Sequence, residues 1–245
     1  MKPFLLIATR AEDAPADDEY AAFLEAGGLA PSDLVRIRLE QRSLPDIDLT
    51  AYSGIIVGGS PFTSSDEQSS KSEVQLRVEA EMAELVDRVI EDDFPFLGAC
   101  YGIGLVGSHL GGIVDKTFGE PIGQVRVDIT PAGSADPLFA GLETPFEAFV
   151  GHKEACSRLP DGAVLLASST GCPVQAFRLG RNVYATQFHP ELDVPGIVTR
   201  IHAYRDFGYF DPETMDALIE HVSAASVVHP SRIVAAFVGR YASAS

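Results

Sequence analysis

The first hundred residues show two different hydrophobic periods. Several apolar runs have the length of a β-strand and are separated by more polar segments. Continuous apolar runs of this kind are typical of strands buried on both faces of a parallel sheet. Such strands are expected at residues 3–9, 33–39, 53–57 and 94–99.

The segments between these runs have a helical period. Apolar residues recur every three or four positions from Val74 to Ile90, which predicts a long amphipathic helix. Shorter helices are expected over 17–27 and from Cys100 to about Leu110, and the Ser- and Thr-rich stretch 60–72 is expected to be a loop. Strand and helix therefore alternate, which predicts an α/β fold with a central, mostly parallel sheet and helices on both faces.

The second half of the chain has a different pattern. Its apolar runs are short, rich in β-branched residues and separated by turn residues, which predicts further strands. These are expected at 125–129, 146–150, 163–168, 174–178 and 182–187. Helical patterning returns after Pro190, with Asp211-Pro212 as a helix start and a last helix from Ser231. We expect a single domain over residues 1–245, of which 200–245 form a helical extension.

The composition of the chain indicates which classes of partner are disfavoured and in which compartment the protein is expected. The chain has 18 basic and 35 acidic residues, a net charge of −17, which disfavours binding to nucleic acid and to anionic membranes. The apolar run near the N-terminus is shorter than a signal peptide requires, and no run is long enough to span a membrane. Three cysteines without CxxC spacing argue against a disulfide framework. A reducing, cytoplasmic location is therefore expected.

Cys100 lies in the sequence Gly-Ala-Cys-Tyr-Gly, between a predicted strand and a predicted helix. This is the context of a nucleophile elbow, in which small residues allow a sharp turn that presents the nucleophile above the sheet. The N-terminus of the following helix favours a thiolate. The pentapeptide alone is equally compatible with a buried structural cysteine beside a tight turn.

The same region contains a competing motif. Residues 102–107 read Gly-Ile-Gly-Leu-Val-Gly, which matches the dinucleotide-binding fingerprint, and Asp115 or Glu120 lies near the position of a ribose-binding acid. The match lies mid-chain with a cysteine at the turn, and a β-rich segment follows it. We therefore favour a nucleophile elbow over a nicotinamide site, and expect no cofactor.

His189 and Glu191 are candidate partners for Cys100. Pro190 favours an extended conformation at His189, and residues two apart in an extended chain point to the same side. The Glu191 carboxylate can then orient the imidazole while its other nitrogen serves a nucleophile. A surface His-Pro turn is the plain alternative for this segment alone. The remaining histidines lack the spacing of metal ligands, so no metal is expected.

Acyl transfer also requires donors for the oxyanion. The backbone N–H of Tyr101 directly follows the candidate nucleophile, and Gly59 lies in a glycine turn where a backbone can approach closely. Both are therefore candidate oxyanion donors, although the glycine turn by itself is equally explained as the end of a strand.

Four motifs together resemble the class I glutamine amidotransferases, especially the glutaminase domain of GMP synthase and its stand-alone relatives. They are Gly-Gly-Ser-Pro at 58–61, Gly-Ala-Cys-Tyr-Gly at 98–102, Gly-His-Lys-Glu at 151–154 and Phe-His-Pro-Glu at 188–191. The resemblance covers about residues 1–195. It implies the flavodoxin-like fold of that family and a catalytic triad of Cys100, His189 and Glu191. It further implies an oxyanion hole at Gly59 and Tyr101, and backbone contacts to substrate near Gly151 and His152.

One departure bears on the substrate. The family usually has glutamine four residues after the nucleophile, where it helps to hold the substrate, and this chain has Gly104. A wider pocket at Gly104 would suit γ-glutamyl peptides, on which some stand-alone relatives act. Three hypotheses follow: a glutaminase that delivers ammonia to a separate synthase chain, a γ-glutamyl peptidase, and a catalytically silent binding module. The first two share a small-molecule substrate, glutamine or another γ-glutamyl compound.

Overall fold

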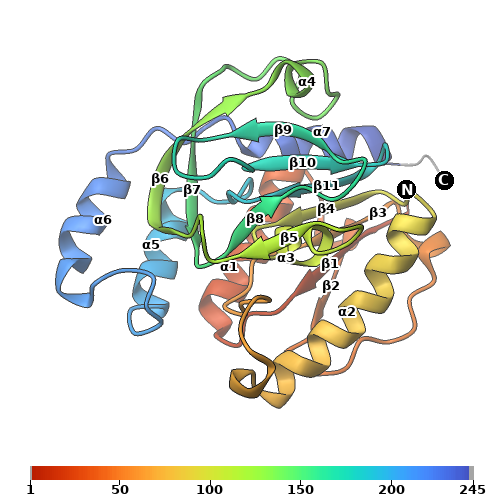
Figure 1. Cartoon of the computed structure of the whole chain (residues 1–245), viewed down its shortest axis with the longest axis horizontal. Helices are drawn as coiled ribbons and strands as arrows, with labels where there is room; N and C mark the ends of the chain where they lie inside the picture. Colours follow the sequence, from red (N-terminus) through yellow and green to blue (C-terminus); the bar gives the residue numbers. More distant parts are fainter. Residues whose placement is uncertain (1, 243–245) are drawn as a thin grey trace.

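A mixed sheet forms the centre of the molecule in the computed structural model, which describes residues 2–242 (Figure 1). Over these residues the sheet has nine strands, in the order β2 (Leu34–Arg38), β1 (Phe4–Ala8), β3 (Gly54–Val57), β4 (Phe96–Ala99), β11 (Val183–Thr186), β10 (Ala176–Leu179), β9 (Val164–Ser168), β6 (Glu120–Ile129) and β7 (Phe146–His152). Pairing is parallel from β2 to β11 and antiparallel from β11 to β7. Two short strands, β5 (Ile113–Asp115) and β8 (Ala155–Arg158), form a separate antiparallel pair.

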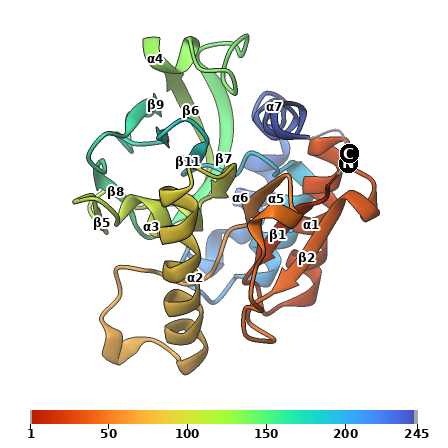
Figure 2. The same cartoon turned by 90° about the vertical axis from the view of Figure 1, so that its right-hand side faces the viewer.

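Helices cover both faces of this sheet (Figure 2). On one face lie α2 (Glu73–Glu91) and α3 (Tyr101–Gly107), and on the other lie α1 (Asp13–Gly27) and α7 (Ser231–Tyr241). The remaining α-helices of the described residues are α4 (Pro131–Ser134), α5 (Val194–Ala203) and α6 (Met215–Ser223). Along β1, Leu5 and Ile7 belong to the apolar cluster that includes α2 and α3, whereas Phe4 and Leu6 belong to the cluster that includes α1 and α7. Because side chains alternate across a strand, a strand covered on both faces must be apolar at every position.

The predicted α/β fold is confirmed, and its main elements lie near their expected positions. Helix α2 spans the predicted apolar period, with Ser72 as N-cap accepting a hydrogen bond from Gln75 N–H. Helix α7 begins at Ser231 as expected and buries Ile233, Val234, Phe237 and Val238.

Three details differ from the expectations. Helix α1 begins at Asp13 rather than residue 17, because Pro15 lies in its first turn, where a missing N–H costs no hydrogen bond. Strand β6 begins at Glu120, five positions before the predicted 125–129. The pair β5 and β8 was not predicted, because each strand is short and its partner lies forty or more positions away along the chain.

Helices α5 and α6 pack at one end of the sheet (Figure 1). Helix α5 begins at Val194, where the Asp193 side chain accepts a hydrogen bond from Gly196 N–H. Ile197 and Ile201 of α5 form an apolar cluster with Val222 of α6 and with Ile122 of β6. Helices α5 and α6 are therefore joined to the β-rich half by a separate apolar cluster, whereas α7 packs in the cluster that includes α1.

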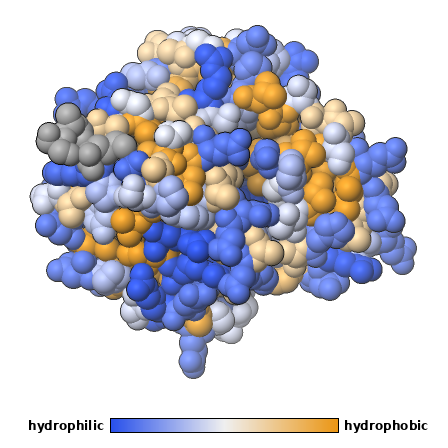
Figure 3. Space-filling view, turned by 180° about the vertical axis from the view of Figure 1, so that it is seen from behind, coloured by the Kyte–Doolittle hydropathy of each residue, from blue (hydrophilic) through white to orange (hydrophobic). Residues whose placement is uncertain are grey.

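The surface view in Figure 3 shows apolar areas interrupted by hydrophilic side chains over the face opposite to that of Figure 1. No helix within residues 2–242 combines the length and the apolar character needed to cross a membrane.

Candidate functional site

Four parallel strands bring distant residues to one edge of the sheet. Arg10, Gly59, Cys100 and His189 each follow the carboxyl end of one of the neighbouring strands β1, β3, β4 and β11. Thr186 of β11 pairs with Ala99 of β4, so the segments leading to Cys100 and His189 start side by side. The carboxyl edge of a parallel sheet is where open α/β folds place their ligands.

Cys100 has the backbone of a nucleophile elbow. Its φ of 54° and ψ of −77° lie in a region that L-residues rarely adopt, and α3 starts at the next residue. The Cys100 N–H donates to Thr186 O at 2.7 Å, which fixes the turn to β11. A Cβ on Gly98 would lie 2.6 Å from Gly102 Cα, so the turn requires a glycine at position 98.

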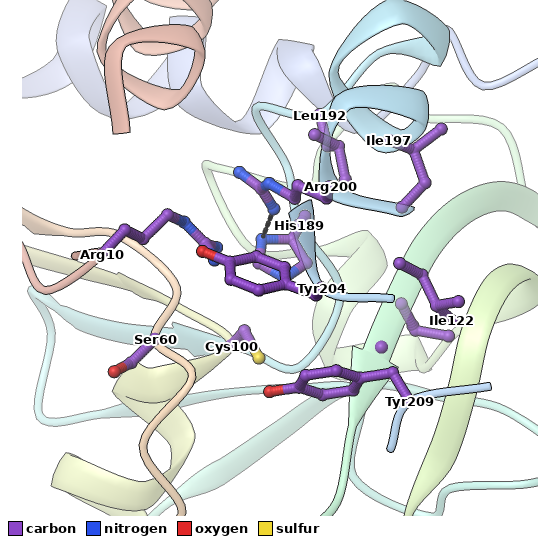
Figure 4. Close-up of a pocket in the computed structure, with 12 residues that line it drawn as sticks. Arg10, Ser60, Cys100, Ile122, His189, Leu192, Ile197, Arg200, Tyr204 and Tyr209 are labelled. Carbon is purple, nitrogen blue, oxygen red and sulfur yellow. Dashed lines mark hydrogen bonds between the residues drawn. The ribbon is translucent and has the colours of Figure 1, made fainter. Parts of the chain in front are cut away.

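Cys100 and His189 line the same cavity (Figure 4). The structure thus brings together two residues that lie 89 positions apart in the sequence. Apolar side chains from β6, β7 and α5 form one part of the wall, and the segment after α5 forms another. The other lining residues are Arg10, Ser60, Ile122, Val150, Gly151, Leu192, Ile197, Arg200, Tyr204 and Tyr209.

Two neighbours compete for one nitrogen of His189. Its Nδ1 lies 2.9 Å from Glu191 Oε1 and 2.8 Å from Arg200 Nη1. A ring nitrogen that carries a proton donates to the carboxylate, and one without a proton accepts from the guanidinium. Only the first tautomer leaves Nε2 with the lone pair that a general base needs. The backbone N–H of His189 donates to Phe149 O at 3.0 Å and anchors this segment to β7.

A network of buried charges surrounds His189. Arg200 Nη2 lies 2.8 Å from Glu191 Oε1 and 3.3 Å from Glu19 Oε1, and Arg10 Nε donates to the same Glu19 oxygen at 2.9 Å. The four residues that carry these charges are each at most 4% exposed. Two guanidinium groups thus balance two carboxylates, which is what buried charges require.

Burial dominates the protonation of the site. It raises the pKa of Cys100 to about 12, against the opposing effect of Arg10 and Arg200. Burial and then the Arg200 charge lower the pKa of His189 to about 4. For Glu191, burial acts to raise the pKa, but His189 and Arg200 outweigh it and hold the pKa below its usual range. At neutral pH the pair is therefore a neutral thiol and a neutral imidazole next to a carboxylate.

The two candidate oxyanion donors, Tyr101 and Gly59, differ in whether their N–H groups are free to bind a ligand. Tyr101 is the first residue of α3, where a helix leaves its N–H groups without an intrahelical partner. The Gly59 N–H already donates to Glu19 Oε1 at 3.1 Å, so it does not point freely at the cavity. The neighbouring Ser60 N–H has no hydrogen bond within the described part of the chain. A Cβ on Gly59 would lie 2.5 Å from His189 Cε1, so a side chain at position 59 would displace the imidazole.

The predicted substrate-binding positions line a second cavity that also reaches Cys100. Gly104, Gly151 and His152 all belong to its wall. The His152 ring contacts Glu154 O at 2.9 Å and Glu120 Oε2 at 3.0 Å, so both ring nitrogens already have partners within the protein.

The expectation of a wider pocket at Gly104 is wrong. A Cβ at this position would collide with Ser64 Oγ and lie 3.1 Å from Glu154 Oε1. The loop that follows β3 therefore fills the space that a longer side chain would take.

The competing dinucleotide motif does not form the required loop. Residues 102–107 lie within α3, and all of α3 is buried. A pyrophosphate needs the first glycines in an open turn before the helix, and here Cys100 makes that turn.

Several residues of the site had no sequence signal. Arg10 lies two positions after the end of β1, but no motif around it indicates a functional role. Arg200, Tyr204 and Tyr209 come from the C-terminal region, for which the sequence pattern indicated only helix. Glu19 lies on a helix and reaches the site only through the packing of α1 against α5.

Comparison with known proteins places the chain in a family. The model of the class I glutamine amidotransferase family matches residues 24–195. The chain belongs to this family. The matched segment includes Cys100, His189 and Glu191, and ends at the start of α5.

Relatives of this amidotransferase family member include both long and short proteins. It is 32% identical over 179 residues to a GMP synthase (glutamine-hydrolyzing) of Lactobacillus delbrueckii subsp. bulgaricus, covering 71% of this chain and 32% of the relative. It is 31% identical over 163 residues to one subunit of the GMP synthase (glutamine-hydrolyzing) of Methanobrevibacter smithii, covering 66% of this chain and 74% of the relative. The chain thus spans about a third of the length of the longer synthase.

Solved structures show the same fold. A glutamine amidotransferase from Thermotoga maritima superposes with a TM-score of 0.78 at 18% identity, over the full length of both chains. A glutamine amidotransferase from Methylobacillus flagellatus gives a TM-score of 0.71 at 19% identity, over 99% of this chain and 94% of the other.

Proposed function

We propose that this chain hydrolyses a γ-glutamyl amide, in the simplest case glutamine to glutamate and ammonia, through a thioester on Cys100. The observation that carries this proposal is the cavity shared by Cys100 and His189. Cys100 lies at a strained turn directly before α3, and the His189 imidazole contacts Glu191. Membership of the amidotransferase family supports it.

The proposed cycle starts from the neutral pair. His189 accepts the Cys100 proton on Nε2 as the sulfur attacks the γ-carbonyl carbon, and Glu191 stabilises the imidazolium through Nδ1–H. The N–H of Tyr101 and a second donor from Gly59 or Ser60 stabilise the oxyanion. The carbon–nitrogen bond then breaks, and His189 returns its proton to the leaving amine. Water, deprotonated by His189, attacks the thioester and releases the acid and the thiol.

A γ-glutamyl peptidase is the second candidate, and one observation favours it. The cavity that contains His189 is lined by Ile122, Val150, Leu192 and Ile197. Since His189 has to protonate the leaving amine, this apolar cavity lies on the leaving-group side. An apolar amine or amino acid would bury its side chain there, which ammonia cannot do.

The fate of ammonia is a further part of the proposal. The relative from Methanobrevibacter smithii is named as one subunit of a GMP synthase, so we propose that a separate synthase chain receives the ammonia, in the cytoplasm. We also propose that residues 200–245 belong to the same functional unit, because Arg200, Tyr204 and Tyr209 line the cavity.

The test is a substrate comparison on the purified chain. Ammonia release from glutamine and amine release from γ-glutamyl-leucine and γ-glutamyl-glycine are measured for the wild type and for Cys100→Ala. Turnover of glutamine that depends on Cys100 supports the glutaminase. Preference for γ-glutamyl-leucine without glutamine turnover selects the peptidase. Absence of Cys100-dependent turnover of all three compounds contradicts both and leaves the catalytically silent module.

A further inference from the structure

The first cavity takes the leaving group of the proposed reaction, and Arg10 forms part of its wall. Arg10 and His189 line this cavity and not the second one, whereas Cys100 lines both. Because the leaving amine has to receive a proton from His189, the leaving group occupies the first cavity. The Arg10 side chain is therefore placed on the leaving-group side of the sulfur.

The Arg10 guanidinium has donors that the protein does not use. Its Nε donates to Glu19 Oε1 at 2.9 Å, and its Nη1 donates to the Tyr204 hydroxyl at 3.0 Å. Its Nη2 has no hydrogen-bond partner within residues 2–242, although Arg10 is only 4% exposed. Buried polar groups nearly always have partners in proteins. The unused Nη2 donors in the cavity wall therefore indicate an acceptor on a ligand.

The unused nitrogen lies beside the imidazole of the proposed base. A Cβ built on Gly59 would lie 2.5 Å from Arg10 Nη2 and 2.5 Å from His189 Cε1, so these two atoms are at most twice that distance apart. Figure 4 shows the guanidinium directed toward His189. In an α-amino acid the amino and carboxyl groups are attached to the same carbon. A leaving amino acid with its nitrogen at His189 can therefore place its carboxylate on Arg10.

The charges nearest the sulfur favour an anion on this side of it. Burial raises the pKa of Cys100 to about 12, and among the charged neighbours Arg10 and then Arg200 oppose this rise most strongly. The two largest charge effects at the sulfur thus come from guanidinium groups, and both attract an anion. A planar guanidinium also matches the geometry of a carboxylate, a group that ammonia lacks.

We propose that Arg10 forms a subsite for the carboxylate of a leaving α-amino acid. This inference rests on the proposed function and names the substrate class, γ-glutamyl dipeptides with an apolar second residue and a free carboxyl terminus. Hydrolysis consumes one water and releases glutamate and the amino acid, so no further reactant is needed. Tyr204 is a positioning residue, because its hydroxyl holds Arg10 Nη1. The apolar side chain of the leaving amino acid packs on the apolar part of the same wall, formed by Ile122, Val150, Leu192 and Ile197.

The test compares leaving groups with and without the carboxylate. The probes are γ-glutamyl-leucine and γ-glutamyl-isoamylamide, whose leaving amine has the carbon skeleton of leucine without its carboxylate. In the wild type, kcat/KM should favour γ-glutamyl-leucine by about 10- to 100-fold, the range expected for a hydrogen bond to a charged group. In Arg10→Gln this ratio should fall towards one. Arg10→Lys keeps the charge but not the planar fork, so its ratio should lie between the two. A wild-type ratio near one overturns the proposal.

Matched variants separate recognition of the carboxylate from the balance of buried charge. Arg36→Gln removes an ion pair with Asp17 outside both cavities and should keep the wild-type ratio. Tyr204→Phe removes the hydroxyl that positions Arg10 and should lower the ratio, through a higher KM for γ-glutamyl-leucine at similar kcat. If Arg10 serves only to balance Glu19, Arg10→Gln will depress both probes equally and leave the ratio unchanged, which overturns the proposal. Should Arg10→Gln fail to fold, an unchanged ratio in Arg10→Lys has the same meaning.

A binding measurement distinguishes failure of the subsite from failure of the proposed reaction. Calorimetry on Cys100→Ala compares γ-glutamyl-leucine with γ-glutamyl-isoamylamide, with and without Arg10→Lys. Tighter binding of γ-glutamyl-leucine that weakens in Arg10→Lys supports the subsite, even if the wild type turns over neither compound. Equal binding of the two compounds overturns the subsite, whatever the activity assays show.

Discussion

At the scale of single residues, burial and then the charge of Arg200 set the protonation of His189. The Arg200 guanidinium lies 2.8 Å from His189 Nδ1, and after burial its charge contributes most to lowering the pKa of that imidazole to about 4. The base-competent form of His189 is the neutral one, so activity should persist as pH falls until the imidazole becomes protonated. We expect kcat/KM to be flat through neutral pH and to fall only in the region of pH 4–5.

Replacing Arg200 should move this acid limb. In Arg200→Gln the positive charge next to His189 is lost, so the pKa of His189 rises and the acid limb of kcat/KM shifts to higher pH. The pH profile of kcat/KM measures the shift. Arg205→Gln is the control, because Arg205 is exposed on the same segment. A limb that stays in place in Arg200→Gln contradicts this role.

Glu191 is expected to act through His189 without touching the substrate. In Glu191→Gln the carboxylate that accepts the Nδ1–H bond is replaced by an amide, which stabilises the imidazolium poorly and no longer selects the base-competent tautomer. By analogy with other catalytic triads we expect kcat to fall by about 10²- to 10⁴-fold with a small change in KM. Steady-state kinetics measure both parameters, and a rise in KM at unchanged kcat would argue for substrate binding instead.

At the scale of elements, the elbow between β4 and α3 depends on Gly98. A Cβ there would lie 2.6 Å from Gly102 Cα, whereas a Cβ on Gly102 has no neighbour within 4 Å outside its helix. Gly98→Ala should therefore lower the free energy of unfolding by about 1–3 kcal/mol and reduce turnover by moving Cys100. Gly102→Ala is the matched control and should change both much less. Denaturant unfolding and kcat measure the two effects, and equal effects from both variants would count against a tight elbow.

The elements that the sequence predicts best are those whose burial follows a simple period. Strand β1 is apolar at every position because both of its faces are covered, and α2 has an apolar stripe because only one side is buried. Strands β5 and β8 lack such a period. Their positions depend on pairs such as Val114 with Cys156, which form only in the folded chain.

The residues of the site also differ in whether a local sequence pattern predicts them. Cys100, His189 and Glu191 lie in local motifs whose residue types and spacing indicate chemistry. Glu19 and Arg200 have no local motif, because their role depends on α1 packing against α5 at the end of the sheet. Ser64 fills the space next to Gly104, and the sequence could not predict this because it depends on how a loop folds over α3.

At the scale of the whole molecule, the C-terminal helices hold the cavity wall in place. Tyr204 and Tyr209 lie between α5 and α6, and Val222 of α6 is fully buried in the cluster that joins these helices to β6. Val222→Ala should lower the free energy of unfolding by about 1–3 kcal/mol and raise KM by loosening this wall. Val228→Ala is the control, because Val228 is 62% exposed and should change stability by less than about 0.5 kcal/mol. A similar effect from both variants would show that the wall does not depend on α6.

The account as a whole depends on a covalent bond to Cys100, and trapping that bond is its most direct test. The protein is mixed with γ-glutamyl-p-nitroanilide and quenched in acid within the first turnovers, and intact mass and peptide mapping locate the adduct. We predict one γ-glutamyl group on Cys100, and none on the buried Cys156 and Cys172 or in the Cys100→Ala variant. Turnover without an adduct on Cys100, or undiminished turnover in Cys100→Ala, would contradict the account.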